Sequence, residues 1–145
     1  MKPDWTHVVT WLLVLGGWGV VHWATLCRDR RKEKREISAN VCKNLLALQD
    51  NAIDFHTAQY FEVRKSTDIA QQVERVAIQL QKCPLEELQI PIARIVALRQ
   101  RITRQNIDPT SFAPQSADSN LILEIRNAVT DVIAAIEDGR ERVWR

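Results

Sequence analysis

The chain contains few residues that interrupt regular structure. Only four of its 145 residues are glycine and five are proline. With 46% hydrophobic and 26% charged residues, the composition is that of a globular chain. The length fits one small domain with an appendage.

Cysteine is also scarce, and the three thiols show no paired spacing. Cys27, Cys42 and Cys83 form neither a C-x-x-C motif nor a Cys/His ligand set, so we expect no metal site and no disulfide framework. We expect Cys42 to pack against apolar neighbours. The sequence also has no Gly-rich phosphate loop, G-x-S-x-G elbow or H-E-x-x-H motif. We therefore predict no enzymatic activity, no cofactor and no small-molecule substrate.

His56 is the only histidine in the C-terminal three-quarters of the chain. Asp54 and Tyr60 lie nearby, and an acid/base site can be drawn with them. However, Asp54 at i−2 projects from a different face of a helix than Tyr60 at i+4. We favour a solvated or partly packed histidine over a catalytic one.

Formal charge is absent from Val8 to Cys27, a run of 20 residues. At about 1.5 Å per residue, a helix of this length spans the roughly 30 Å of a bilayer's hydrocarbon core. We predict a transmembrane helix over residues 5–27. No A-x-A-like cleavage site follows the run, and Leu26 before Cys27 does not fit a lipoprotein signal, so the helix is expected to be a permanent anchor.

A dense charge block, RDRRKEKRE over residues 28–36, follows the apolar run with a net charge of +3. Basic flanks stay on the cytoplasmic side of a membrane, so we predict a single-pass protein with its N-terminus outside and its C-terminal domain in the cytoplasm. The same cations are predicted to attract anionic lipid. They are Arg28, Arg30, Arg31, Lys32, Lys34 and Arg35.

One stripe of the predicted membrane helix collects its aromatic and polar residues. At about 100° per residue the stripe holds His7, Trp11, Leu15, Trp18, His22 and Thr25. It either faces another membrane helix, with Gly16 and Gly19 allowing close approach, or places both histidines at interfacial depth in contact with water. We favour contact with water slightly.

Helical periodicity dominates the remaining 109 residues. It predicts a first helix up to about Val63, continuous or bent near Asp50, and then a turn or N-cap at Ser66-Thr67-Asp68. A second helix follows and ends at Lys82-Cys83-Pro84. For residues 37–145 we predict a bundle of about four antiparallel helices in an all-α chain.

The second half of the bundle is predicted in the same way. Pro91 fits the first turn of a helix whose inward residues are Ile92, Ile95, Leu98 and Ile102. Residues 107–120 read as a loop, and Asp118, Ser119 or Asn120 can cap the last helix. That helix keeps a stripe of Ile122, Ile125, Val129, Val132, Ile136 and Val143, on which Gly139 is expected to weaken the final turn.

The bundle carries no excess of basic charge. From Ile37 onward, 13 Lys/Arg residues oppose 14 Asp/Glu residues, which argues against nucleic-acid binding. Arg94, Arg101 and Arg104 project to one side as a candidate protein-docking patch. Arg99 projects into the apolar arc, and we expect it to need a carboxylate from another helix.

Phe112 is the only aromatic residue of the 107–120 loop. Loops carry function disproportionately, which makes Phe112 a candidate partner contact. The alternative, which we favour, is that its ring plugs the bundle and pins the loop.

The segment GWGVVHWATLCRDRRKEKRE, residues 17–36, resembles that of small uncharacterised bacterial single-pass membrane proteins with a short all-helical cytosolic domain. Such proteins resemble those encoded in prophage or defence-associated regions. The resemblance implies a bacterial inner membrane and supplies no catalytic residues.

These features favour a membrane-anchored helical interaction protein that holds a cytosolic partner, or copies of itself, at the membrane. Its expected contacts are lipid and protein. The alternative is an effector, for example in phage defence, whose membrane helix oligomerises and perturbs the bilayer. We keep both hypotheses.

Overall fold

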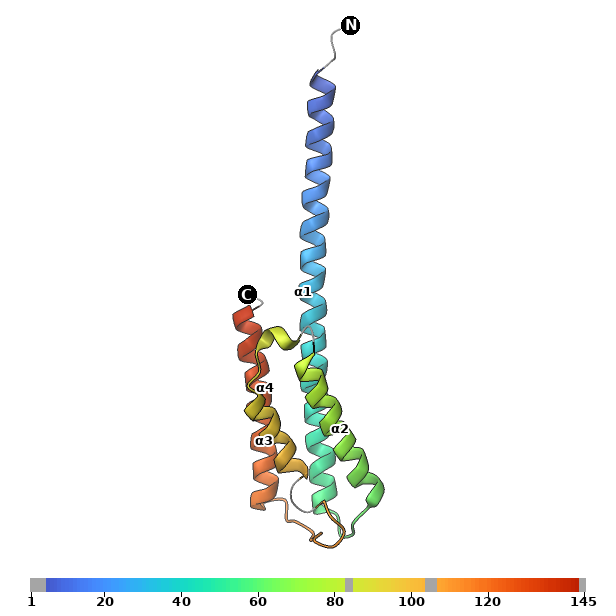
Figure 1. Ribbon diagram of the computed structural model, residues 1–145, viewed down its shortest axis with the longest axis vertical. Helices are drawn as coiled ribbons and strands as arrows, with labels where there is room; N and C mark the ends of the chain where they lie inside the picture. The colour runs from blue at the N-terminus through green and yellow to red at the C-terminus, as the bar shows by residue number, and fades with distance from the viewer. Residues whose placement is uncertain (1–4, 83–84, 104–106, 144–145) are drawn as a thin grey trace. The chain divides into compact units, whose positions relative to one another are not determined.

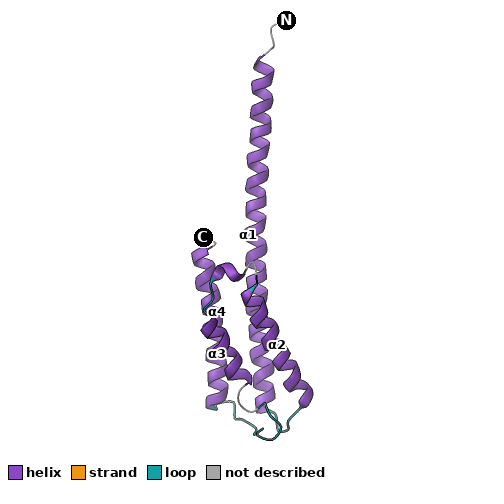
Figure 2. Cartoon of the chain, viewed as in Figure 1, coloured by secondary structure: helices purple, strands orange, loops and turns teal. Residues whose placement is uncertain are grey.

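The computed structural model describes residues 5–82, 85–103 and 107–143, and within these ranges the regular structure is all helical, without a strand (Figures 1 and 2). The predicted all-α class is confirmed. The chain divides into an N-terminal unit, Met1–Arg35, and a C-terminal unit, Glu36–Arg145. The elements are α1 (Trp5–Thr57), α2 (Val63–Gln81), the short 3₁₀ helix η1 (Leu85–Leu88), α3 (Ile92–Thr103) and α4 (Asn120–Val143).

The N-terminal unit consists of the first part of α1, and it buries almost nothing. All side chains from Val9 to Leu26 are exposed, and Leu13 reaches 72%. Because the apolar residues are exposed in every direction around the axis, this segment has no apolar stripe set against a polar face. It is long and apolar enough to cross a membrane.

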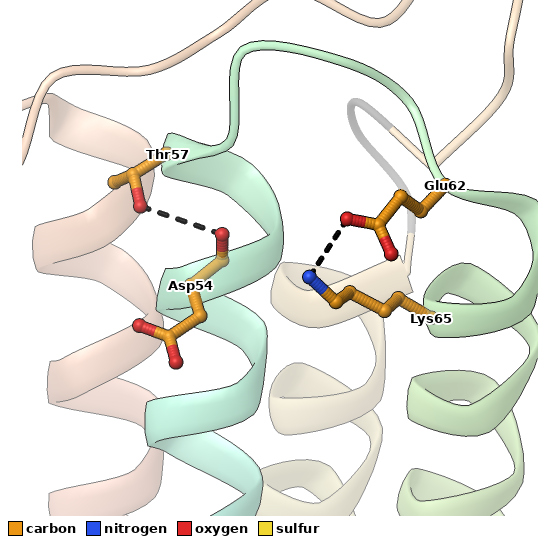
Figure 3. A network of polar contacts seen from close by, with 4 residues as sticks. All are labelled: Asp54, Thr57, Glu62 and Lys65. Carbon is orange, nitrogen blue, oxygen red and sulfur yellow. Dashed lines mark hydrogen bonds and ion pairs between the residues drawn. The ribbon is translucent and has the colours of Figure 1, made fainter.

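The helix α1 ends six residues before the predicted limit, and no break at Asp50 interrupts it. The Thr57 hydroxyl donates to the Ile53 carbonyl oxygen at 2.8 Å. It also lies 3.5 Å from the Asp54 carbonyl oxygen, one of the acceptors that the last turn leaves open (Figure 3). Residues 58–62 form the connection to α2. An ion pair of 2.8 Å between Glu62 and Lys65 lies at the start of α2 (Figure 3).

The predicted turn at Ser66-Thr67-Asp68 is wrong, because these residues lie inside α2. Serine and threonine favour turns only when their hydroxyls compete with the helical backbone bonds. Here the Thr67 hydroxyl donates to the Val63 carbonyl one turn back, at 3.0 Å. The Ser66 hydroxyl reaches the Ile107 carbonyl at 3.4 Å, so both are compatible with a helix. The predicted end of α2 is confirmed, with Gln81 last and Lys82 as C-cap.

All four α-helices contribute one face to the core of the C-terminal unit. The helix α1 supplies Val41, Leu45, Leu48, Ala52 and Phe55, and α2 supplies Ile69, Val73, Val76 and Leu80. The remaining helices bury Ile95, Leu98 and Ile102 from α3 and Ile122, Ile125, Val129, Val132 and Ile136 from α4. The prediction for Ile92 is wrong. Its side chain is 66% exposed because it lies off the stripe that Ile95, Leu98 and Ile102 form.

Polar contacts define how neighbouring helices pair within this unit. Arg94, near the start of α3, donates to the Asp131 carbonyl at 2.8 Å, and Arg101, near its end, pairs with Glu124 at 2.6 Å. As the residue number rises along α3 it falls along α4, so the two helices run in opposite directions (Figure 1). Between α1 and α2, the Asn51 amide donates to Gln72 at 3.0 Å.

The element η1 has no counterpart in the sequence prediction. Its Leu85 and Leu88 are both buried, and it is followed by Gln89 in the left-handed region at φ 51°. Gly139 of α4 is buried against Leu88. Gly139 is therefore a packing position, a role that the expected weakening of the final turn did not include.

Candidate functional site

The predicted stripe of the N-terminal unit contains a stacked ring pair. The rings of Trp18 and His22 lie 5.4 Å apart between centroids and 6° from parallel. They are one helical turn apart, so α1 itself positions them. Trp11 and Trp18 are exposed, and no atom lies within 4 Å of where a Cβ would sit on Gly16 or Gly19. Within this unit, the pair presents an aromatic and polar surface, while Gly16 points to nearly the opposite side of the helix from Trp18.

The charge block is sorted by the helix into two sides. At about 100° per residue, Arg28, Arg31, Lys32 and Arg35 fall within an arc of about 100°. Asp29 and Glu33 point away from that arc, in nearly the same direction as Trp18 and His22. Sequence reasoning counted a net charge of +3 and missed this separation, although a helical projection of residues 28–35 contains it. The basic arc is a surface that anionic lipid headgroups can contact.

The arginines of α3 are engaged with neighbouring helices. As given above, Arg94 and Arg101 contact α4, while Arg104 lies outside the described residues. Arg99 forms an ion pair of 3.3 Å with Glu74 of α2, which confirms the predicted carboxylate partner from another helix. The predicted burial of Arg99 is wrong, because its side chain is 61% exposed. These cations therefore brace helix pairs.

Phe112 joins an aromatic cluster at one end of the C-terminal unit. Its ring lies 5.4 Å from Phe55 and 5.5 Å from Phe61 between centroids, and it is half-buried. The loop is tied to the same helix end because the Gln115 N–H donates to the His56 carbonyl at 2.8 Å. The favoured interpretation, in which Phe112 pins its loop, matches these contacts. Sequence reasoning missed the participation of Phe61.

His56 is fully buried, so the predicted solvated or partly packed ring is wrong. Its imidazole packs edge-on against Phe55 at 5.1 Å. Burial lowers the pKa of His56, and a hydrogen bond with the Ile102 backbone opposes that effect in part. The result is a neutral ring in the core at physiological pH.

Cys42 packs against the core as predicted. Burial raises the pKa of its thiol, and the nearby Glu137 carboxylate adds to this effect. Cys27 is half-buried, and Cys83 lies outside the described residues. Within the described ranges, no three His, Cys, Asp or Glu side chains come together as metal ligands.

Comparisons of the chain with protein-family models, with curated proteins and with solved structures find no match. The likeness of residues 17–36 to bacterial single-pass proteins therefore stays a prediction.

Proposed function

We propose that this chain is a single-pass protein of the bacterial inner membrane that holds a protein partner, or its own oligomer, at the cytoplasmic face. Residues 5–27 cross the bilayer, and residues 37–145 form an antiparallel four-helix bundle in the cytoplasm. The observation that carries the proposal is the exposure of apolar side chains in every direction from Val9 to Leu26. Such a surface is stable in hydrocarbon and unfavourable in water, at about 25 cal/mol for each Å².

The charges flanking this segment support the orientation. Before the apolar run, Lys2 is offset by Asp4, whereas the block after it has a net charge of +3. Cytoplasmic flanks are enriched in Lys and Arg. The basic arc of Arg28, Arg31, Lys32 and Arg35 adds attraction to anionic lipid of about 1 kcal/mol per cation near the surface.

Membrane fractionation tests the anchor. The full chain, expressed in bacteria, should remain in the membrane pellet after an alkaline carbonate wash. Arginine at a helix centre costs about 2.5–3.5 kcal/mol for insertion, so Leu12→Arg with Leu13→Arg should move the protein out of that pellet. Leu46→Arg with Leu123→Arg is the matched control, since both leucines are exposed on the C-terminal unit. Equal behaviour of the two variants would refute the anchor.

Thiol labelling tests the orientation. In a chain with Cys27, Cys42 and Cys83 replaced by serine, a cysteine is introduced at Lys2 or at Ala39. A membrane-impermeant maleimide added to intact spheroplasts should label the first variant and spare the second. The reverse pattern would place the helical unit on the outer side.

The effector alternative is favoured by one observation, the exposed stack of Trp18 and His22 on a helix that also has open space at Gly16 and Gly19. If these helices associate and perturb the bilayer, expression should collapse the membrane potential and arrest growth. Trp18→Ala and His22→Leu should relieve that effect, whereas Leu13→Ala, whose exposed side chain points away from the ring stack, should not. Expression without any effect on potential counts against this alternative.

A further inference from the structure

A groove runs along the line where α1 and α2 meet in the C-terminal unit. It consists of two hollows of about 320 Å³ and about 290 Å³ that share Asn44 and Gln79. The first is also lined by Ala47, Asn51, Gln72, Arg75 and Val76. The second is also lined by Ile37, Asn40, Val41, Lys82 and Leu85.

The lining combines an apolar floor with amide and cationic walls. Val41, Val76 and Leu85 are buried and form the floor. Five amides line the walls, and no described lining residue is acidic: Asn40, Asn44, Asn51, Gln72 and Gln79. Arg75 and Lys82 are the cations, and neither forms an ion pair with another residue that the structure describes.

The spacing of the first two amides of α1, Asn40 and Asn44, is close to the two-residue repeat of an extended polypeptide, whereas the step on to Asn51 is not a multiple of it. Asn40 and Asn44 are four residues apart on α1, which is about 6 Å, and Asn51 follows about 10.5 Å further on. An extended chain repeats its orientation every two residues, about 6.6–6.8 Å. A side-chain amide offers one acceptor and two donor hydrogens, so it can bond the N–H and C=O groups of a peptide. The hydrogen bond from Asn51 to Gln72 joins the two walls at one end of the groove, so the peptide would lie along Asn40, Asn44 and Gln79.

We propose that this groove binds an extended acidic peptide segment of a protein partner. The amides bond the peptide backbone, and Arg75 and Lys82 pair with its carboxylates. A helical ligand fits less well, because the backbone groups in a helix interior are already bonded to one another. From Asn40 to Asn51 the groove spans about 16 Å, which corresponds to about five extended residues. This inference rests on the proposed interaction function and gives the chemistry of the partner.

Fluorescence anisotropy of the full chain in phosphatidylcholine nanodiscs tests the groove without a charged lipid surface. The probe is a labelled seven-residue peptide of alternating alanine and glutamate. We expect saturable binding that weakens at least about tenfold when lysine replaces glutamate. A similar loss should follow when alternate backbone nitrogens are methylated, because methylation removes the donors that the amides would bond. Equal binding of the acidic and basic peptides would overturn the proposal.

Two pairs of variants locate the binding. Gln79→Leu and Arg75→Gln should each weaken the acidic peptide about five- to tenfold, the loss of one hydrogen bond or one charge pair. Their controls, Gln71→Leu and Arg64→Gln, are exposed on α2 and do not line the groove, so they should leave binding unchanged. Equal effects within a pair, or no saturation at millimolar peptide, would refute the groove. A chain that does not bind the peptide but stays in the carbonate-washed pellet would refute the groove and leave the membrane anchor standing. A chain that binds the peptide but leaves the pellet would refute the anchor and leave the groove standing.

Discussion

Gly139 of α4 lies directly against Leu88 of η1. A Cβ at Gly139 would sit 2.9 Å from both the Leu88 Cβ and the Leu88 carbonyl oxygen. The obstructing atoms include backbone, which cannot turn aside as the end of a flexible side chain can. The absence of a side chain at Gly139 thus lets η1 pack on α4 and bury Leu85 and Leu88.

Gly139→Ala should therefore destabilise the C-terminal unit in spite of a better helix propensity. Alanine is favoured over glycine in a helix by about 1 kcal/mol, whereas overpacking costs about 1–3 kcal/mol. We expect a net loss of up to about 2 kcal/mol in the free energy of unfolding. Circular dichroism in urea, with the full chain in mild detergent, measures this loss. Ala134→Gly, at an exposed site of the same helix, calibrates the propensity effect. Stabilisation by Gly139→Ala would contradict the close contact.

Phe112→Ala should destabilise the same unit by opening the aromatic cluster. Replacing a fully buried phenylalanine by alanine lowers the free energy of unfolding by about 3–5 kcal/mol. For this half-buried ring we expect a loss of about 2 kcal/mol. Tyr60→Ala is the matched control, because Tyr60 is 78% exposed in the neighbouring connection. Equal losses in urea unfolding of the two variants would show that the contacts with Phe55 and Phe61 contribute little.

Periodicity predicted the helices best where an apolar stripe is long. The predicted stripe of α4 is buried from Ile122 to Ile136, where it repeats over several turns, whereas its last predicted member, Val143, is 41% exposed. The four residues of η1 complete barely one turn, so they carry no periodic signal, and their burial depends on the absent side chain at Gly139. The connection at 58–62 contains neither glycine nor proline, which explains why the end of α1 was placed too late.

The candidate sites divide in a similar way. A single helix determines that Trp18 stacks on His22 and that the charges of residues 28–35 are sorted, so both follow from the sequence once the helix is accepted. The amide groove depends on which face of α1 meets which face of α2, and no local pattern contains that pairing. The burial of His56 likewise depends on tertiary packing. Its ring packs against Phe55 of the same helix and forms a hydrogen bond with the backbone of Ile102 in α3.

The buried His56 should make stability depend on pH in mildly acidic solution. Because burial lowers its pKa in the folded state, the unfolded chain binds the proton more readily. The contribution of a neutral His56 is complete above the unfolded pKa of about 6.5 and is lost as the pH falls below it toward the folded value. We expect the urea concentration at the midpoint of unfolding to decrease as the pH is lowered from about 7 to about 5.

His56→Gln identifies the source of this dependence. The variant should flatten the pH dependence between pH 7 and pH 5, whatever its effect on absolute stability. The pKa of Asp108 is also lowered, by hydrogen bonds from the Thr110 hydroxyl and N–H, but that carboxylate titrates below its ordinary value of 3.8 and outside this window. If the variant keeps the pH dependence of stability seen in the wild type, that dependence comes from other titratable groups.

Ser119→Ala should weaken the start of α4. The Ser119 hydroxyl oxygen accepts from the Ile122 N–H at 3.4 Å, and α4 begins at the next residue, so Ser119 is the N-cap among the three predicted candidates. Loss of a serine cap costs about 0.5–2 kcal/mol, and the long bond places this one near the lower end. Ser119→Asp should restore stability, because a carboxylate both caps the helix and favours its positive end. Ser116→Ala should be neutral in the same urea titration. Ser116 is exposed, and its hydrogen bond within the described residues is made by its carbonyl oxygen, which accepts from the Ser119 N–H at 3.0 Å and is kept in alanine. If aspartate fails to restore what alanine removes, the contribution of Ser119 is not capping.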